Sequence, residues 1–292
     1  MSDGWDADAA RRAKAVLIDA TVPNAARVGD FLHGGRDNFE ADRKAVRALV
    51  ASAPSVAEIP AAARAFRGRV VRYLAAEAGV RQFLDIGAGM APPGNTHEVA
   101  QAVDPSCRIV YVESDPMVLS HAQAKIRSAP GGVVTCIEGD IGDADAIIAG
   151  ASLTLDFGQP IAVMLMSALA HVASSAAAAK VVSSLMTAVP SGSYLAVYHL
   201  ASDLDPALTR ALKHWNAMAR PMTLRSRAEV AALFDGLDLV PPGVVPLQDW
   251  ASGAGASGDG ASGDGASGDG ASGEGASGGM RVPVHGAVAS KS

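Results

Sequence analysis

Short apolar runs alternate with longer segments of helical pattern from Arg81 to Leu200. The runs have the length and residue types of buried strands, and they are Gln82 to Ile86, Arg108 to Val112, Val133 to Ile137, Ile161 to Met166 and Tyr194 to Tyr198. The segments between them are long enough for helices and span residues 98–103, 116–127, 143–149 and 176–189. This alternation is typical of βαβ units. It predicts an α/β fold, a Rossmann-like sheet with helices on both faces.

Two of the expected helices have clear start signals. Asn95 followed by Glu98 resembles a capping box, and Asp115 before Pro116 provides an N-cap with proline at the first helical position. Both helices begin just after the first and second expected strands, where open α/β sheets bind ligands. The carboxyl edge of the sheet is therefore the expected site.

The two ends of the chain differ from this central pattern. The N-terminal part is helical, with Ala45 to Ala51 and Ala61 to Ala78, and we expect residues 1–79 to form a helical cap before a sheet domain over residues 80–292. Residues 251–279 repeat Ala-Ser-Gly-Asp-Gly and hold no apolar residue larger than alanine, which predicts a disordered insertion. The β-prone run Val284 to Ala289 follows and is expected to pair as a C-terminal β-hairpin with Leu239 to Trp250.

Composition and charge narrow the function classes. Hydrophobic residues make up 49% of the 292 residues and charged residues 18%, which suits a folded globular protein. The net charge is −6, and no Lys/Arg cluster supplies the footprint of a nucleic-acid binder. The start of the chain is unlike a signal peptide, and no apolar run of about 18 residues occurs. We expect a cytoplasmic protein without nucleic-acid or membrane partners. A homodimer is compatible with this sequence.

The strongest local motif is Phe83-Leu84-Asp85-Ile86-Gly87-Ala88-Gly89, a strand that ends in an acidic residue and a Gly-x-Gly turn. Glycines in such a turn let the backbone approach a ligand closely. A dinucleotide site would have a third glycine where this chain has Pro92. Because the prolines there would spoil the helix N-terminus that holds a pyrophosphate, the motif favours S-adenosylmethionine over the cofactor of a nucleotide-dependent oxidoreductase. Cys107 and Cys136 lack the spacing of zinc ligands, so no metal is expected.

Acidic residues also follow the next two strands. Glu113 ends the second strand, where a carboxylate can accept hydrogen bonds from both ribose hydroxyls of an adenosyl ligand. Asp140, after Gly139 and the third strand, offers an acceptor for the adenine amino group. A solvated strand end is the alternative for Glu113, and a turn former or helix cap is the alternative for Asp140.

These motifs, in this order, resemble the class I S-adenosylmethionine-dependent methyltransferases over about Arg81 to Leu200. The segments Pro23 to Val28, Gly34 to Arg43, Arg69 to Gly79 and Asn95 to Val99 resemble a bacterial group of such enzymes whose substrates are largely unknown. The resemblance implies that the glycine turn lies beside the methionine moiety, that Asp85 orients the turn or receives the ammonium group, and that Ser114 and Ile141 flank the adenine. The implied cofactor residues are Asp85, Gly87, Ala88, Gly89, Glu113, Ser114, Gly139, Asp140 and Ile141.

Transfer of a methyl group to a small-molecule acceptor is the expected activity. The reaction is an in-line displacement at a carbon activated by a sulfonium, so positioning and exclusion of water supply much of the catalysis. A general base helps only where the acceptor must lose a proton, and the candidates are His171, His199, His33 and His97. A non-catalytic regulatory or partner module that keeps the cofactor pocket is the main alternative.

The segment Phe31 to Arg43 is predicted to fold over the methyl end of the cofactor as a lid or acceptor wall. It combines backbone freedom with ion-pair and hydrogen-bond groups in Gly34, Gly35, Arg36, Asp37 and Asn38. Ser167, which follows the fourth strand, is a further candidate on the acceptor side. A plain surface turn is the alternative for the lid segment.

Overall fold

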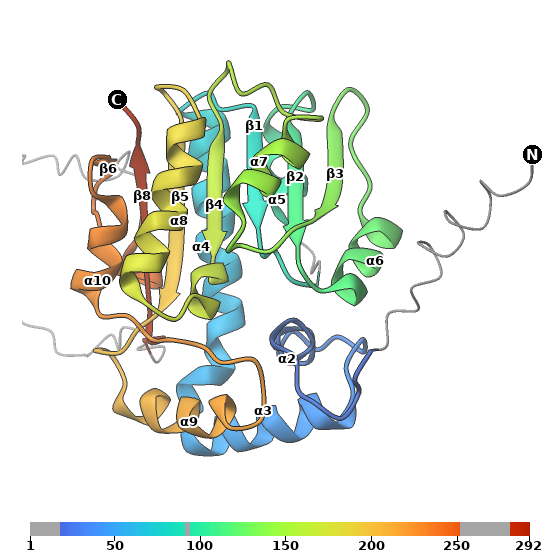
Figure 1. Ribbon diagram of the computed structural model, residues 1–292, viewed down its shortest axis with the longest axis vertical. Coiled ribbons are helices and arrows are strands. Elements are labelled where there is room, and N and C mark those ends of the chain that lie inside the picture. Colours follow the sequence, from blue (N-terminus) through green and yellow to red (C-terminus); the bar gives the residue numbers. More distant parts are fainter. Residues whose placement is uncertain (1–17, 91–93, 252–280) are drawn as a thin grey trace, which may run out of the picture.

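The computed structural model describes residues 18–90, 94–251 and 281–292. The described residues form an 8-stranded sheet in the order β3-β2-β1-β4-β5-β8-β6, with β7 also paired to β8 (Figure 1). The strands are β1 (Gln82–Ile86), β2 (Arg108–Glu113), β3 (Val133–Glu138), β4 (Ala162–Met166), β5 (Tyr194–Leu200), β6 (Asp238–Leu239), β7 (Val245–Pro246) and β8 (Val284–Ser290). The strand order confirms the expected α/β fold with a Rossmann-like sheet.

The first five strands run parallel, and the chain reverses its direction of travel across the sheet between β1 and β4. Ligands bind at such a switch point, outside the carboxyl ends of the strands. The loops that follow β1 and β4 therefore flank the expected site. The observed bounds of β1 are the same as the predicted ones, and the other four parallel strands differ from prediction by at most a few residues at one end.

The last strand, β8, confirms the expected C-terminal pairing. It runs antiparallel between β5 on one side and β6 with β7 on the other. Of the segment predicted to be a disordered insertion, all but Ala251 lies outside the described residues. Asp249 and Arg281, which bracket residues 252–280, form an ion pair at 3.2 Å.

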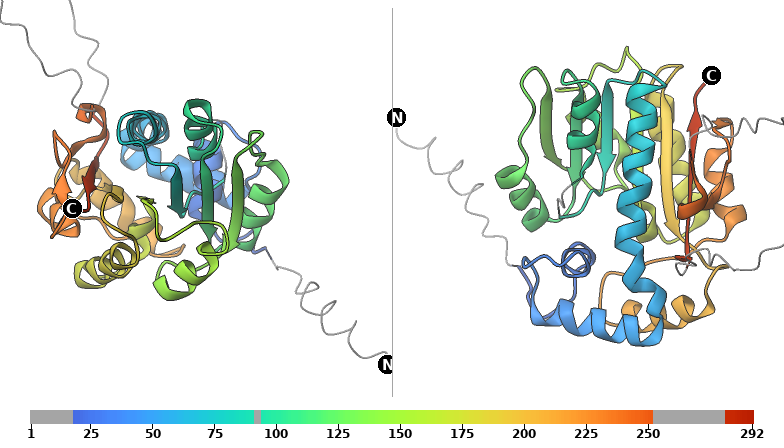
Figure 2. Two further views of the ribbon diagram at one scale, coloured as in Figure 1. Left: turned by 90° about the horizontal axis from the view of Figure 1, so that it is seen from above. Right: turned by 180° about the vertical axis from the view of Figure 1, so that it is seen from behind.

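Helices cover both faces of the sheet (Figure 1; Figure 2, right). One face carries α4 (Ile59–Ala76) and α5 (Thr96–Val103), while the other carries α7 (Ala144–Ala151), α8 (Ser175–Ala188) and α10 (Arg227–Ala231). Alternate residues of β1 serve the two cores, because successive strand side chains point to opposite faces. Leu84 and Ile86 join the α7–α8 core, and Phe83 joins the α4–α5 core.

The two predicted helix starts had different outcomes. Asp115 caps α6 (Pro116–Lys125), because its side chain accepts hydrogen bonds from the first free backbone N–H groups, as predicted. The capping box expected at Asn95 and Glu98 was wrong. Asn95 makes no cap hydrogen bond and instead accepts one from Arg67, while Glu98 accepts one from the Gly94 N–H.

A helical layer closes the carboxyl edge of the parallel strands. It contains α2 (Ala25–Leu32), α3 (Glu40–Ser52) and α9 (Pro206–Asn216), which lie below the sheet in Figure 1. Val46 and Leu49 of α3 pack with Leu208 and Trp215 of α9 in a separate core. The layer is thus built from α2 and α3, which precede the sheet in the sequence, and from α9, which follows β5. Within the described ranges, none of the helices has the length and apolarity needed to cross a membrane.

Candidate active site

A cavity of about 630 Å³ lies between the carboxyl edge of the sheet and the helical layer. Its walls come from α2, the first half of α4, and the loops after β1, β2, β3 and β4, together with the end of β5 and the segment around Arg220. Such a volume is typical of small-molecule and cofactor sites. Of the predicted site residues, those that line it are Gly87, Ala88, Gly89, Glu113, Ser114, Gly139, Ile141, Ser167, His33 and His171.

The turn after β1 needs glycine at two positions. Gly87 and Gly89 have φ angles of +74° and +72°, a conformation that side-chain-bearing residues rarely adopt. A Cβ on Gly87 would also lie 2.9 Å from the Cβ of Ala168, in the loop after β4. The Gly87 N–H donates to the Val112 carbonyl at 2.8 Å, which ties the turn to the end of β2.

Glu113 is a buried carboxyl group at the end of β2. It is 8% exposed, and its Oε1 accepts a hydrogen bond from the Gly89 N–H. Burial raises the pKa of Glu113 to about 7, against the opposing effect of the Gly89 hydrogen bond. The neighbouring carboxylates Asp85 and Asp115 push the pKa in the same direction as burial. Glu113 therefore changes its charge near neutral pH.

Asp85 lies behind the glycine turn and does not line the cavity. It is 1% exposed, and its Oδ2 accepts a hydrogen bond from Thr96 Oγ1 at 2.6 Å. Its Oδ1 has no hydrogen-bond partner among the described residues. Burial raises the pKa of Asp85, while the guanidinium of Arg67 lowers it. Asp85 is thus a buried acceptor with free hydrogen-bonding capacity.

Arg67 was missed by sequence reasoning. This α4 residue lines the cavity at 6% exposure, and its Nη1 donates to Asn95 Oδ1 at 2.9 Å. Its Nε has no hydrogen-bond partner in the described part of the chain. Its position in the helix could have revealed it, because Arg67 falls on the apolar stripe that α4 buries through Ala63, Val70 and Leu74. A cation on such a stripe is rare unless it serves a partner.

The loops after β2 and β3 are joined by Arg220. Asp140 is exposed and outside the cavity lining, and its Oδ1 accepts from the Gly142 N–H at 2.8 Å. Arg220 Nη2 lies 3.3 Å from Asp140 Oδ2, and Arg220 Nη1 lies 3.5 Å from Ser114 Oγ. Arg220 itself lines the cavity, so it forms part of the wall where these two loops meet.

Two of the four candidate histidines lie away from the cavity. His97 Nδ1 and the His97 backbone N–H both contact the Tyr111 hydroxyl at 2.9 Å. His199 Nδ1 lies 2.9 Å from the Leu200 carbonyl and Nε2 lies 2.5 Å from Arg225 Nη1, and burial lowers the pKa of His199 to about 4. These rings bind neighbouring elements together and leave no ring nitrogen of His199 free. We therefore keep only His33 and His171 as candidates for acceptor contact.

His33 and His171 line the same cavity, and in the two rings the proton is on different nitrogen atoms. His33 Nδ1 lies 2.6 Å from Arg64 Nη2, and because a guanidinium only donates, Nδ1 accepts and the proton of the neutral ring is on Nε2. His171 Nδ1 lies 3.1 Å from the Pro221 carbonyl, which only accepts, so Nε2 of His171 is unprotonated. Burial lowers the pKa of both rings. His33 can donate a hydrogen bond, and His171 can accept a proton.

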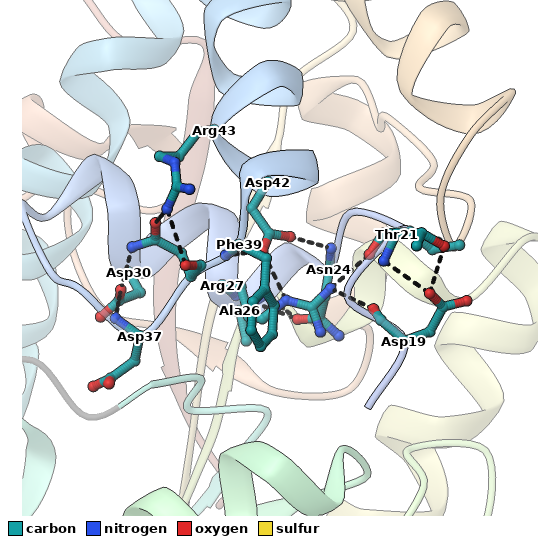
Figure 3. Close-up of polar contacts among 12 residues, drawn as sticks. Asp19, Thr21, Asn24, Ala26, Arg27, Asp30, Asp37, Phe39, Asp42 and Arg43 are labelled. Atoms are coloured by element: carbon teal, nitrogen blue, oxygen red, sulfur yellow. Dashed lines mark hydrogen bonds and ion pairs between the residues drawn. The ribbon is translucent and has the colours of Figure 1, made fainter. Parts of the chain in front are cut away.

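The predicted lid residues brace the helical layer and do not line the cavity. Asp30 of α2 does line it, and Asp30 Oδ2 accepts hydrogen bonds from Asn38 Nδ2 at 2.8 Å and from the Asp37 N–H at 2.9 Å (Figure 3). Asp37 also reaches α6, where its Oδ2 lies 2.7 Å from His121 Nε2 and 2.9 Å from Lys125 Nζ. The cavity wall is thus α2, and the segment after it fastens α2 to α6.

A buried ion pair fixes α2 against α3. Arg27 Nε donates to Asp42 Oδ2 at 2.8 Å, and Asp42 also accepts from the backbone N–H groups of Asn24 and Phe39 (Figure 3). Asn24 caps α2, and its Nδ2 donates to Asp115 Oδ2, the cap of α6, at 2.7 Å. The caps of α2 and α6 are therefore linked at the wall of the cavity.

Ser167, which lines the cavity directly after β4, has a strained backbone. Its φ is +72°, and the other described residues with positive φ are glycines. Strain of this kind clusters at functional sites. The Ser167 N–H donates to the Tyr198 carbonyl at 3.0 Å, so β5 holds the residue in this conformation.

The fold and the cavity together define the class of this protein. Five parallel strands with an antiparallel β8 beside β5, a glycine turn after β1 and a buried carboxyl group at the end of β2 are the arrangement expected of a class I methyltransferase. The family model described as S-adenosyl methyltransferase matches residues 11–275. The chain belongs to the S-adenosyl methyltransferase family, as the sequence motifs indicated.

Two solved structures are similar to this chain over nearly their whole length. One is a DUF574 family protein from Streptomyces avermitilis MA-4680, at 34% identity and a TM-score of 0.82, with 94% of this chain and 99% of that chain covered. The other is a methyltransferase candidate from Thermobifida fusca YX, at 32% identity and a TM-score of 0.78, with 94% and 96% covered. A comparison with curated proteins gave no match.

Proposed function

We propose that the chain binds S-adenosylmethionine in this cavity and transfers its methyl group to a small-molecule acceptor. The observation that carries the proposal is a pair of buried polar groups, Asp85 behind the glycine turn and Arg67 in the cavity wall. Asp85 Oδ1 and Arg67 Nε lack hydrogen-bond partners among the described residues. The amino-acid end of the cofactor has one ammonium and one carboxylate group. A zwitterion of this kind can satisfy both atoms, directly or through water.

The rest of the lining fits the remainder of the cofactor. Glu113 offers Oε2 to the ribose hydroxyls while Oε1 holds the Gly89 N–H. Ser114 and Ile141 form the two sides of an adenine slot, and Arg220 spans the loops at its outer edge. Asp140 would accept from the adenine amino group while it keeps its contact with Arg220, because each carboxylate oxygen can accept two hydrogen bonds. When bound, the cofactor supplies an electrophilic methyl carbon on a sulfonium.

Room for an acceptor supports methyl transfer over cofactor binding alone. The cavity lining continues beyond the glycine turn to side chains that the cofactor does not need, and these are Leu32, His33, Ile59, Leu200 and Met222. Mostly apolar walls exclude water from the reacting atoms. The unprotonated Nε2 of His171 is the group that can remove a proton from an acceptor. The segment Phe31 to Arg43 would keep α2 in place over this region through Asp37.

Binding of S-adenosylhomocysteine should strengthen as the pH rises from 6 to 8. The ribose hydroxyls donate to the charged form of Glu113, whose pKa in the free protein is about 7. Below that pKa the carboxyl group must lose a proton on binding, which costs up to about tenfold in affinity per pH unit. Calorimetric titrations at pH 6, 7 and 8 measure the effect.

Glu113→Gln should weaken binding at pH 8 by about 10- to 100-fold and remove most of the pH dependence, because it deletes the charge-assisted hydrogen bond. Glu138→Gln is the matched control, since Glu138 is exposed and is the register partner of Glu113 on β3. Equal affinities of the parent protein at pH 6 and pH 8 would show that Glu113 does not hold the ribose.

A further inference from the structure

The His33–Arg64 pair is a polar feature of the cavity that the proposed cofactor contacts leave unused. His33 is the C-cap of α2, Arg64 belongs to α4, and their contact at 2.6 Å places the ring proton on Nε2. Arg64 is half-buried, and its Nε has no partner among the described residues. His33 therefore has an N–H donor at Nε2, and the Arg64 cation at Nδ1 polarises it.

The charges that act on His33 are predominantly positive. Burial, together with the guanidinium groups of Arg64 and Arg67, lowers its pKa to about 4, against the opposing effect of the Asp30 carboxylate. His33 is therefore neutral at physiological pH and donates through Nε2 without changing charge. Arg67 affects the pKa of both His33 and Asp85. Arg67 is therefore near both His33 and the proposed amino-acid subsite.

The surroundings of this donor strengthen its preference for a negative charge. Apolar side chains from α2 and α4 line the same part of the cavity, and they are Leu32, Ile59, Pro60 and Ala63. Electrostatic interactions are stronger where apolar groups replace water. A protonated amine would meet an N–H donor with the Arg64 guanidinium behind it, whereas an oxyanion would accept a hydrogen bond from that donor and be attracted by that cation.

We propose that His33, backed by Arg64, binds the oxygen atom that is methylated, and that the acceptor is an acidic hydroxyl compound, a phenol or an enol, which reacts as its anion. This inference rests on the proposed function. The acceptor first loses its proton, to solvent or to His171. Its oxygen then uses an electron pair to bond the methyl carbon while the carbon–sulfur bond breaks, and that pair stays on sulfur. The negative oxygen and the positive sulfonium are both neutral in the products, a methyl ether and S-adenosylhomocysteine.

The test uses 4-nitrophenol, whose anion absorbs visible light, added to the protein saturated with S-adenosylhomocysteine. We expect the bound probe to be the anion, with its pKa lowered by about one unit or more, because the His33 N–H donates to it and the Arg64 cation lies behind that ring. 4-Nitroaniline has nearly the same shape but no acidic proton, and it should bind at least tenfold more weakly. Bound 4-nitrophenol in its protonated form, equal binding of the two probes, or binding of neither would overturn the proposal.

Variants locate the effect. Arg64→Gln and His33→Phe should each reduce the pKa shift of bound 4-nitrophenol by at least half, whereas Arg64→Lys, which keeps the charge, should retain most of it. Arg72→Gln is the control, since Arg72 is an exposed arginine of the same helix. An unchanged shift in both Arg64→Gln and His33→Phe would refute the assignment. Calorimetry with S-adenosylhomocysteine tests the proposed function, and titration of the free protein with 4-nitrophenol tests this inference. The calorimetric result can fail while the titration succeeds, so the two failures are distinguishable.

Discussion

A chain that ends at Trp250 should not fold cooperatively. The truncation removes β8, whose first six residues are buried and which pairs with β5 over its whole length. It also removes Val282, Val284 and Val288 from the α4–α5 core. Burial of one such valine contributes about 1.5–3 kcal/mol. The total stability of a domain is about 5–15 kcal/mol, so the loss of three valines and a strand is of the same order as the whole.

Urea denaturation followed by circular dichroism checks this result. The control is a chain in which a short Gly-Ser turn replaces residues 252–280, which keeps β8. The Asp249–Arg281 ion pair shows that the two ends of that segment lie close together, so a short turn can join them. Loop-closure entropy changes slowly with length, and the control should unfold at a midpoint close to that of the parent. Equal midpoints for the truncated and the shortened chains would mean that β8 is dispensable.

Arg67→Gln should lower the affinity for S-adenosylhomocysteine by about 10- to 100-fold. The variant replaces a buried cation that we propose pairs with the carboxylate of the ligand, and a hydrogen bond to a charged group contributes about 1.5–3 kcal/mol. The comparison ligand is 5′-methylthioadenosine, which has the adenosyl group and sulfur but no amino-acid end. Its affinity should change less than threefold.

This comparison separates ligand binding from a structural role of Arg67. Arg67 also holds Asn95, so a variant that disturbs the start of α5 would weaken both ligands together. Arg67→Lys keeps the positive charge and should recover part of the affinity for S-adenosylhomocysteine alone. Calorimetry measures the affinity of each ligand for the parent protein and for both variants. Parallel losses for both ligands would contradict the assignment of Arg67 to the carboxylate.

The central sheet was predictable because its strands have a strong period and clear boundaries. Gln82 to Ile86 ends at a glycine turn, and that signal gave both bounds of β1. The C-terminal strand was predictable because a β-prone run followed a segment that cannot bury apolar surface. β6 and β7 were not resolved from the sequence as separate strands, since each has two residues and exists only through pairing with β8.

The helical layer was only partly predictable. α2 was not identified as a helix, because its eight residues bury only Arg27 and Val28, too short a stripe to give a period. The usable signal was Asn24, a residue type that commonly caps helices. The glycine-rich segment after α2 was interpreted as the lid itself. In the fold it braces α2, because Asp37 is fastened to α6 and Asn38 to Asp30.

The candidate site was predictable where it follows strand ends, and less so elsewhere. Gly87, Gly89 and Glu113 come together because parallel strands end at one edge of the sheet. Arg64 and Arg67 come from α4, and no motif in the sequence of this helix indicated that it contributes to the site. The sequence also could not show which of the four candidate histidines line the cavity. The choice depended on the hydrogen-bond partners that the fold gives each ring, as for His199 with Arg225.

The most direct test of the account is a calorimetric titration of the full chain at pH 8 with S-adenosylmethionine, S-adenosylhomocysteine and NAD. The first two should bind with one ligand per chain, because Glu113, Arg67 and Asp85 match an adenosyl group with an amino-acid end. NAD should not bind at the same concentrations, because the loop after Gly89 lacks the third glycine of a pyrophosphate site. Binding of NAD as tight as that of S-adenosylhomocysteine, or no binding of either adenosyl ligand, would contradict the account.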